Sequence, residues 1–190
     1  MRSQKIQVKF YADRPEAVES EAAVPVFHTW IREHKIGDGE LLIDVANYSH
    51  VPKGPGVALI GHESDYFLDQ GEGRLGLLYS RKRGFEGDAK ACVADAFRRA
   101  LVACRLLEKE GSVRVRFRTN EALVRIQDRL NAPNTAETFA ELEPVLREVL
   151  ARLYDGEVQL EHVADARAPF TVRVRTQAVD GVDSLLARVS

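Results

Sequence analysis

The sequence has little of what most often reveals a protein's function. It contains two cysteines, one methionine and one tryptophan, and no apolar run approaches the roughly 20 residues that a membrane span needs. Neither sign of charge dominates, since 16 basic and 17 acidic residues precede Gly111 and 11 and 12 follow it. Phosphate neutralisation needs a positive face, so this balance argues against a nucleic-acid partner. The lack of long apolar runs argues against a membrane partner.

Motifs for catalysis and cofactor binding are also absent. No Walker-type or dinucleotide pattern occurs, and the Gly54-Pro55-Gly56 turn leads into a predicted strand, not the helix N-terminus that binds phosphate. Neither Gly-x-Ser-x-Gly nor His-Glu-x-x-His is present. Cys92 and Cys104 fall in one predicted helix, about 18 Å apart, which is too far for a disulfide. The cofactor is therefore unknown. The polar N-terminus favours a cytoplasmic protein.

Apolar periodicity predicts an α+β fold, mostly antiparallel sheet with helices packed on one face. Strands are expected at residues 5–11, 40–47, 57–62, 65–69, 75–80, 112–118, 157–163 and 170–176. Helices are expected at residues 25–34, 88–109, 121–130, 135–154 and 182–189. The loops between residues 41 and 79 are too short for helical crossovers, so this segment should be an antiparallel meander.

Two units are expected within this fold. Residues 1–110 would form an α+β unit around the central meander, and residues 111–190 a smaller, ferredoxin-like unit packed closely against it. The pattern IQVKF near the start matches VRVRF after Gly111, which suggests two related β-α-β-β-α-like halves. Chance similarity between two amphipathic strands explains the match equally well.

The meander carries the densest group of chemically useful side chains. Asp44 lies in an aliphatic stretch, where an unpaired carboxylate is costly, and His62 ends the next predicted strand. Paired in a hairpin, these strands would bring Asp44 and His62 together, as a general acid/base pair or metal-ligand support requires. Asp44 and His62 are therefore the candidate catalytic residues. The structural alternative is that Asp44 accepts a hydrogen bond from a backbone amide or from Tyr48.

Four neighbouring side chains are candidates for ligand binding. They are His50 on the loop, Glu63 next to His62, and the basic residues Arg74 and Arg81. The spacing of His50 and His62 matches no specific metal signature, so they are only weak candidates for a metal site.

Five arginines alternate on two predicted strands: Arg114, Arg116, Arg118, Arg173 and Arg175. On a shared face they would suit an anion or RNA. However, Glu157, Gln159 and Glu161 alternate on the strand expected beside them, so cross-strand charge pairing is the simpler explanation. Stacking aromatics are also missing from the polar faces of these strands.

The leading interpretation is a soluble binding or accessory protein with a small-molecule site over the meander, able to form a homo-oligomer. The alternative is a metal-assisted or acid/base hydrolase that uses Asp44, His50, His62 and Glu63. A third is an RNA-associated protein. The identity of the small molecule, and whether the protein is an enzyme, do not follow from the sequence.

Overall fold

The computed structural model describes residues 5–37, 39–52, 54–165 and 167–189. Eight strands in these residues form one antiparallel sheet, in the order β2-β3-β4-β5-β1-β6-β8-β7. In chain order the strands are β1 (Ile6–Ala12), β2 (Leu42–Tyr48), β3 (Gly56–Gly61), β4 (Ser64–Asp69), β5 (Gly76–Arg81), β6 (Phe117–Ile126), β7 (Val158–His162) and β8 (Phe170–Thr176). The predicted α+β class and the antiparallel meander are confirmed.

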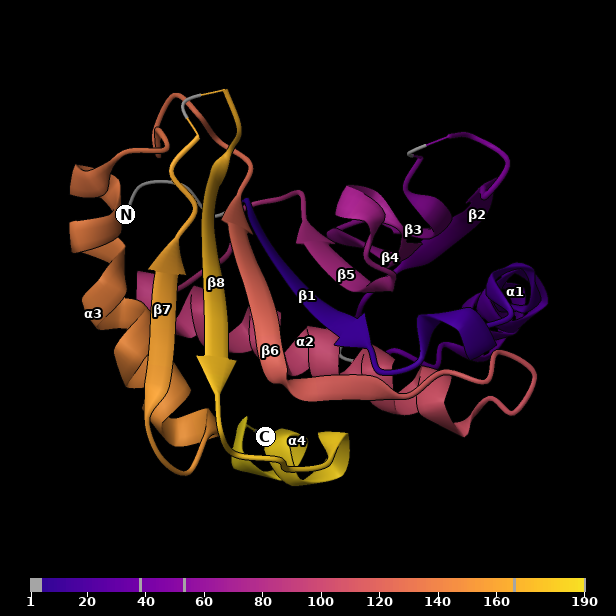
Figure 1. Cartoon of the computed structure of the whole chain (residues 1–190). Helices are drawn as coiled ribbons and strands as arrows, with labels where there is room; N and C mark the ends of the chain where they lie inside the picture. The colour runs from indigo at the N-terminus through magenta and orange to yellow at the C-terminus, as the bar shows by residue number, and fades with distance from the viewer. Residues whose placement is uncertain (1–4, 38, 53, 166, 190) are drawn as a thin grey trace.

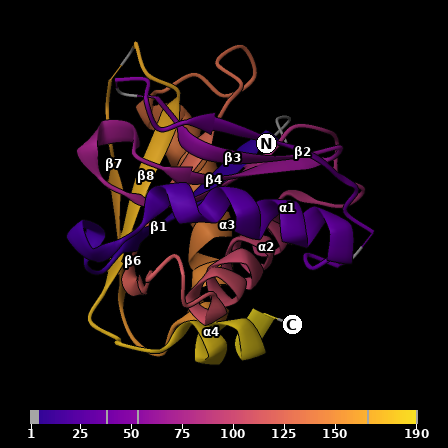
Figure 2. The same ribbon diagram turned by 90° about the vertical axis from the view of Figure 1, so that its right-hand side faces the viewer.

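The helices are α1 (Ala23–Glu33), α2 (Ala89–Lys109), α3 (Ala136–Leu153) and α4 (Val182–Val189), with short 3-10 helices at Pro15–Ala17, Ser20–Ala22 and Gly71–Gly73. Helix α1 contacts β2 and β3, α2 contacts β1 and β5, and α3 contacts β7. Figure 1 looks onto the helix-free face of β1, β6, β8 and β7, with α2 behind these strands and α3 at the left beside β7. Figure 2 shows α4 beside α2 at one end of the molecule. No helix in the described ranges combines the length and apolar content that crossing a bilayer requires.

The core lies between the sheet and its helices. Val8 and Phe10 of β1 are fully buried, and the Phe97 ring of α2 meets Phe10 edge-on with ring centroids 6.1 Å apart. The two cysteines, on the same helix, are both buried and not joined in a disulfide, as expected for small apolar residues.

The helix expected at residues 121–130 is wrong, because these residues largely complete β6. Ala122, Val124 and Ile126 face the core, whereas Arg125 lies on the other side of the sheet. This is the period of two that defines a strand. Leu123, Ile126 and Leu130 also have the spacing of one helix face, and this spacing led to the wrong prediction of a helix. The strand expected at 112–118 is also mostly wrong, since β6 begins only at Phe117.

The sheet is continuous across the expected boundary between the two units. Val8 of β1 lies directly opposite Val124 of β6, so strands from before and after Gly111 are hydrogen-bonded neighbours. The central strands of the sheet therefore come from both sides of Gly111.

One row of cross-strand partners, here called the central row, crosses the helix-free face from edge to edge. Its members, in spatial order, are Ala46, Ala58, Phe67, Leu78, Lys9, Leu123, Arg173 and Glu161. The row is apolar over β2 to β5 and ends in charged residues on β8 and β7. Lys9 lies between Leu78 and Leu123, just before the row becomes charged at Arg173.

Candidate functional site

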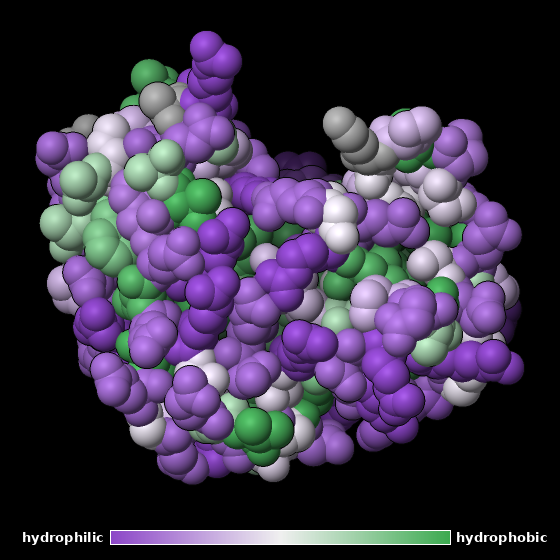
Figure 3. Space-filling model, viewed as in Figure 1, coloured by the Kyte–Doolittle hydropathy of each residue, from purple (hydrophilic) through white to green (hydrophobic). Residues whose placement is uncertain are grey.

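The candidate site is a cavity at the middle of the helix-free face, here called the Lys9 pocket. It has a volume of about 240 Å³, and its walls include Lys9, Asp69, Phe67, Leu78 and Arg125. Figure 3 shows this side of the molecule, with a hollow at its upper edge and apolar surface visible between hydrophilic side chains. The pocket therefore combines apolar walls with a few polar groups, the composition typical of small-molecule sites.

Lys9 is the unusual residue of the pocket, because only 3% of it is exposed to solvent. Its Nζ donates to the Asp69 carboxylate and to the carbonyl oxygen of Gly71, 3.2 Å away. An ammonium group has three N–H donors, and two of them have oxygen acceptors among the described residues, while the Tyr11 ring lies 5.5 Å from Nζ. Desolvation lowers the pKa of Lys9, although the nearby Asp69 carboxylate acts to raise it.

A second ion pair closes one side of the pocket. Arg125 Nη2 donates to the carboxylate of Glu72, which lies in the turn after β4 with φ of 62°. That left-handed conformation is uncommon for glutamate. With Lys9 paired to Asp69 and Arg125 paired to Glu72, the four charges of the pocket cancel.

Amide side chains supply further polar groups. Gln127 Nε2 donates to Gln7 Oε1 over 3.0 Å, and Gln7 Nε2 donates to Ser80 Oγ over 3.1 Å. Gln7 lies two residues before Lys9 on β1, so its side chain points to the same face of the sheet. Gln7 and Gln127 both line the Lys9 pocket, so their amide groups add donors and acceptors to its wall.

Arg74, a predicted ligand-binding residue, lies beside the pocket. Its guanidinium stacks 3.6 Å from the centroid of the Tyr11 ring and donates two hydrogen bonds to Glu121, of 2.8 and 2.7 Å. The hydrogen bonds from Arg74 lower the pKa of the Glu121 carboxyl. Because its donors are engaged in this geometry, Arg74 ties the start of β5 to β6.

Two other cavities border β6, with volumes of about 260 and 460 Å³. Both are lined by Arg118, whose Nε is 3.2 Å from the Asp13 carboxylate, and both side chains of this pair are about half exposed. A solvated pair of this kind is stable without a ligand. The Lys9 pocket is the smallest of these three, but its Lys9–Asp69 pair is much more deeply buried than the Arg118–Asp13 pair.

The expected contact between Asp44 and His62 is wrong. A β-bulge at Ile43 shifts the register, so Asp44 lies opposite Ile60. The Asp44 carboxylate accepts a hydrogen bond from the backbone N–H of Val45 over 2.7 Å. The His62 side chain is 47% exposed and lies 2.8 Å from the Glu63 carboxylate. The catalytic roles of Asp44 and His62 therefore stay predictions without geometric support.

The remaining predicted ligand residues are also separated from each other. His50 is exposed in the turn after β2, whereas Arg81 is buried against Asp95 of α2. Glu63 uses its backbone N–H to donate to Glu40 over 3.2 Å. Across the described ranges, no three histidine, cysteine or acidic side chains are grouped so that they could hold a metal ion.

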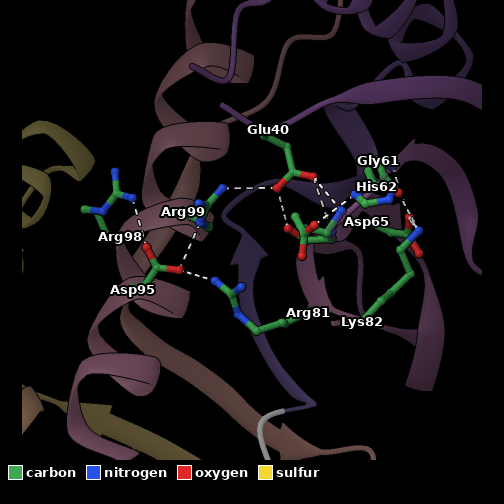
Figure 4. A network of polar contacts seen from close by, with 11 residues as sticks. Glu40, Gly61, His62, Asp65, Arg81, Lys82, Asp95, Arg98 and Arg99 are labelled. Carbon is green, nitrogen blue, oxygen red and sulfur yellow. Dashed lines mark hydrogen bonds and ion pairs between the residues drawn. The ribbon is translucent and has the colours of Figure 1, made fainter. Parts of the chain in front are cut away.

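Glu40 and Asp95 instead organise a buried polar network on the helix side (Figure 4). The Glu40 carboxylate accepts from Ser64 Oγ over 2.6 Å and from Arg99 Nη1 over 3.1 Å. Asp95 accepts from Arg99 Nε over 2.9 Å and from Arg81. The network joins α2 to the β3–β4 turn, so Arg81 has a structural role.

The arginines expected to be paired by Glu161 are placed as the alternation predicts. Arg173 Nη1 lies 3.2 Å and Arg175 Nη1 3.4 Å from the Glu161 carboxylate. Cross-strand pairing is therefore confirmed for these two arginines. Arg114 and Arg116 precede β6 and lie outside that face.

Sequence reasoning missed Lys9 and Asp69. A lysine that alternates with apolar residues on a strand normally faces water, so the pattern IQVKF predicts an exposed Lys9. Lys9 is buried because the sheet order places β1 between β5 and β6, so Leu78 and Leu123 flank it. No family model, curated protein or solved structure matches this chain, so the case for a function depends on the Lys9 pocket itself.

Proposed function

We propose that this protein binds a small, uncharged polar molecule in the Lys9 pocket and acts as a binding or accessory protein. One observation carries the proposal: a buried ammonium group lines a cavity of about 240 Å³ with two of its three donors engaged by the protein. A buried donor without an acceptor costs about 1–3 kcal/mol, and more when it is charged. A carbonyl or hydroxyl oxygen of a bound molecule would remove that cost.

The charges of the pocket favour a neutral molecule. Lys9 and Arg125 are each paired with a carboxylate, so an added anion or cation would leave one charge uncompensated in a partly desolvated place. The volume lies just below the roughly 300–1,000 Å³ of typical ligand pockets, which favours a compact molecule. Small amides, lactams and hydroxylated rings have the required combination of an acceptor and an apolar body.

Phe67 and Leu78 support the same class of molecule. They are cross-strand partners on the central row, and both line the pocket beside Lys9. An apolar ring or chain placed over them would be removed from water while its acceptor points toward Lys9. This gives the molecule one orientation in the pocket.

The test is a fragment screen by nuclear magnetic resonance, using neutral amides, lactams and hydroxylated aromatics. We expect binding fragments to shift the backbone signals of Lys9, Phe67 and Leu78. Lys9→Met should weaken binding roughly tenfold to hundredfold, the worth of one hydrogen bond to a charged group. Arg173→Gln, on the same row outside the pocket, should leave binding unchanged.

Phe67→Ala provides a second variant if Lys9→Met is poorly folded, because Phe67 is only partly buried. It should also weaken fragment binding through the lost apolar contact. Fragments that bind equally well to wild type, Lys9→Met and Phe67→Ala would disprove the proposal.

A further inference from the structure

Exposed apolar side chains gather along one end strand of the sheet. Leu41 and Ile43 are 56% and 55% exposed, and Tyr48 and Val51 are also exposed. All four lie on or next to β2, the end strand opposite β7 in the sheet order. A long apolar edge strand is a template for pairing with another strand, so this clustering needs a physical explanation.

The main chain of β2 has groups directed toward the open edge. Antiparallel strands direct the N–H and C=O of alternate residues toward each neighbour. The N–H of Val45 is bound to the Asp44 side chain, so Val45, and by alternation Asn47, face away from β3. These groups can accept a further strand without disturbing the existing sheet.

We propose that β2 pairs with β2 of a second copy of this chain, antiparallel about a two-fold axis at Val45. In that register Ile43 lies opposite Asn47 of the second copy, and Asp44 lies opposite Ala46. The strand is apolar at its two ends and carries its single charge near the middle. Antiparallel pairing places the start of one strand beside the end of the other, so Tyr48 lies opposite Leu42 of the second copy, between its Leu41 and Ile43, and no like charges face each other.

The opposite edge of the sheet does not offer a competing partner. On β7, the outward side of Val158 is occupied, since Arg147 Nη1 donates to its carbonyl oxygen over 3.3 Å. Glu161 on the same strand is engaged by Arg173 and Arg175. Pairing of β2 with β7 would displace these contacts and build an open chain of molecules, whereas β2 with β2 closes as a dimer.

Asp44 gains a role in this arrangement. Its carboxylate occupies the Val45 N–H, which is one of the donors that dimer pairing requires. The carboxylate must therefore be released when the dimer forms, so Asp44 weakens the dimer. In the monomer it occupies a main-chain donor of the open edge and so opposes pairing with another strand. This inference is independent of ligand binding, because the Lys9 pocket is formed by other side chains.

Sedimentation equilibrium of the full chain tests the dimer, from about 10 µM to about 1 mM, where weak association is measurable. We expect wild type to dimerise within this range and Asp44→Ala to dimerise about tenfold more tightly, because the Val45 donors of both copies are freed. Ile43→Lys should be monomeric. Leu130→Lys removes a 90% exposed leucine elsewhere on the surface and should behave as wild type.

Asn47→Pro gives a second disruption that removes an outward N–H while leaving the β3 ladder in place. It should also be monomeric, with an unchanged circular dichroism spectrum. If wild type and Asp44→Ala both remain monomeric at about 1 mM, the inference is overturned. It is equally overturned if Ile43→Lys dimerises as well as Leu130→Lys, since the dimer would then use another surface.

Discussion

The helix-free face has two halves that differ in how their side chains are satisfied. On the central row, Ala58, Phe67 and Leu78 cover β3 to β5, and none of them carries a polar group. On the other side of Lys9, Arg173 and Glu161 are cross-strand partners and bind each other. The charged half therefore completes its contacts within the chain, while on the apolar half Ala58 and Leu78 are already buried and the partly exposed Phe67 gains free energy when it is covered. A bound molecule or a second copy would act on the apolar half.

Lys9 stands at the boundary and shares features of both halves. It has an apolar neighbour on each side, Leu78 and Leu123, and its partner Asp69 comes from the turn end of β4. The ion pair is thus surrounded by apolar walls, where breaking it is costly. The boundary is the place where a mutation should have its largest effect.

The largest expected effect is that of Lys9→Met, which leaves Asp69 buried without its partner. We expect the free energy of unfolding to fall by about 3–5 kcal/mol, the typical cost of breaking a buried pair from one side. Lys9→Met with Asp69→Leu removes both charges and should restore stability to wild type or above. Urea denaturation of the three proteins measures this. A single variant as stable as wild type would show that Lys9 is solvated and that the two halves have no buried boundary.

Arg74→Met should have the next largest effect, a loss of about 2 kcal/mol, because it removes a bidentate pair and a ring contact. It should also change the response to acid. Arg74 lowers the pKa of folded Glu121 below its ordinary 4.5, so wild type loses this stabilisation as the pH falls below about 4.5. Arg74→Met lacks this interaction, so it has less acid-sensitive stabilisation to lose. Thermal melts at pH 6 and pH 3 should show a smaller acid destabilisation in Arg74→Met than in wild type, and an equal one would contradict this account.

The helices and strands were largely predictable from the sequence, whereas the neighbours of each strand in the sheet were not. Alternation and helical stripes located seven of the eight strands and four helices, because both patterns are local. The error at residues 121–130 arose where apolar residues matched both periods. The bulge at Ile43 changed the register of Asp44, and a shift of one residue moves a side chain to the other face.

The candidate site shows the same limit. Lys9 is buried by β6, whose partner residues Leu123 and Arg125 are more than a hundred positions away in the chain. No local pattern at residues 5–11 contains that information. Conversely, the pairing of Glu161 with Arg173 was predictable, because β7 and β8 are joined by a short loop and their alternation fixes the register.

Phe67→Ala should sharpen the comparison within the apolar half. Phe67 is partly buried, so the loss of its ring should lower stability by about 1–2 kcal/mol, less than for a fully buried phenylalanine. Urea denaturation gives the value. A saturating fragment bound in the Lys9 pocket should stabilise wild type more than this variant, because the ring forms part of its wall. Equal stabilisation would place the fragment elsewhere.

Glu161→Gln in the charged half should have the smallest effect. The carboxylate is about half exposed, and its partners Arg173 and Arg175 are also accessible to water. Exposed pairs contribute about 0–1 kcal/mol, and salt screens them. We therefore expect a change below about 1 kcal/mol in low salt and almost none in about 0.5 M sodium chloride. Denaturation at both salt concentrations tests this. A loss of stability as large as that of Phe67→Ala, persisting in high salt, would contradict this expectation. The ion pairs of the charged half would then contribute as much to stability as the apolar contacts of the other half, and solvation would not distinguish the two halves.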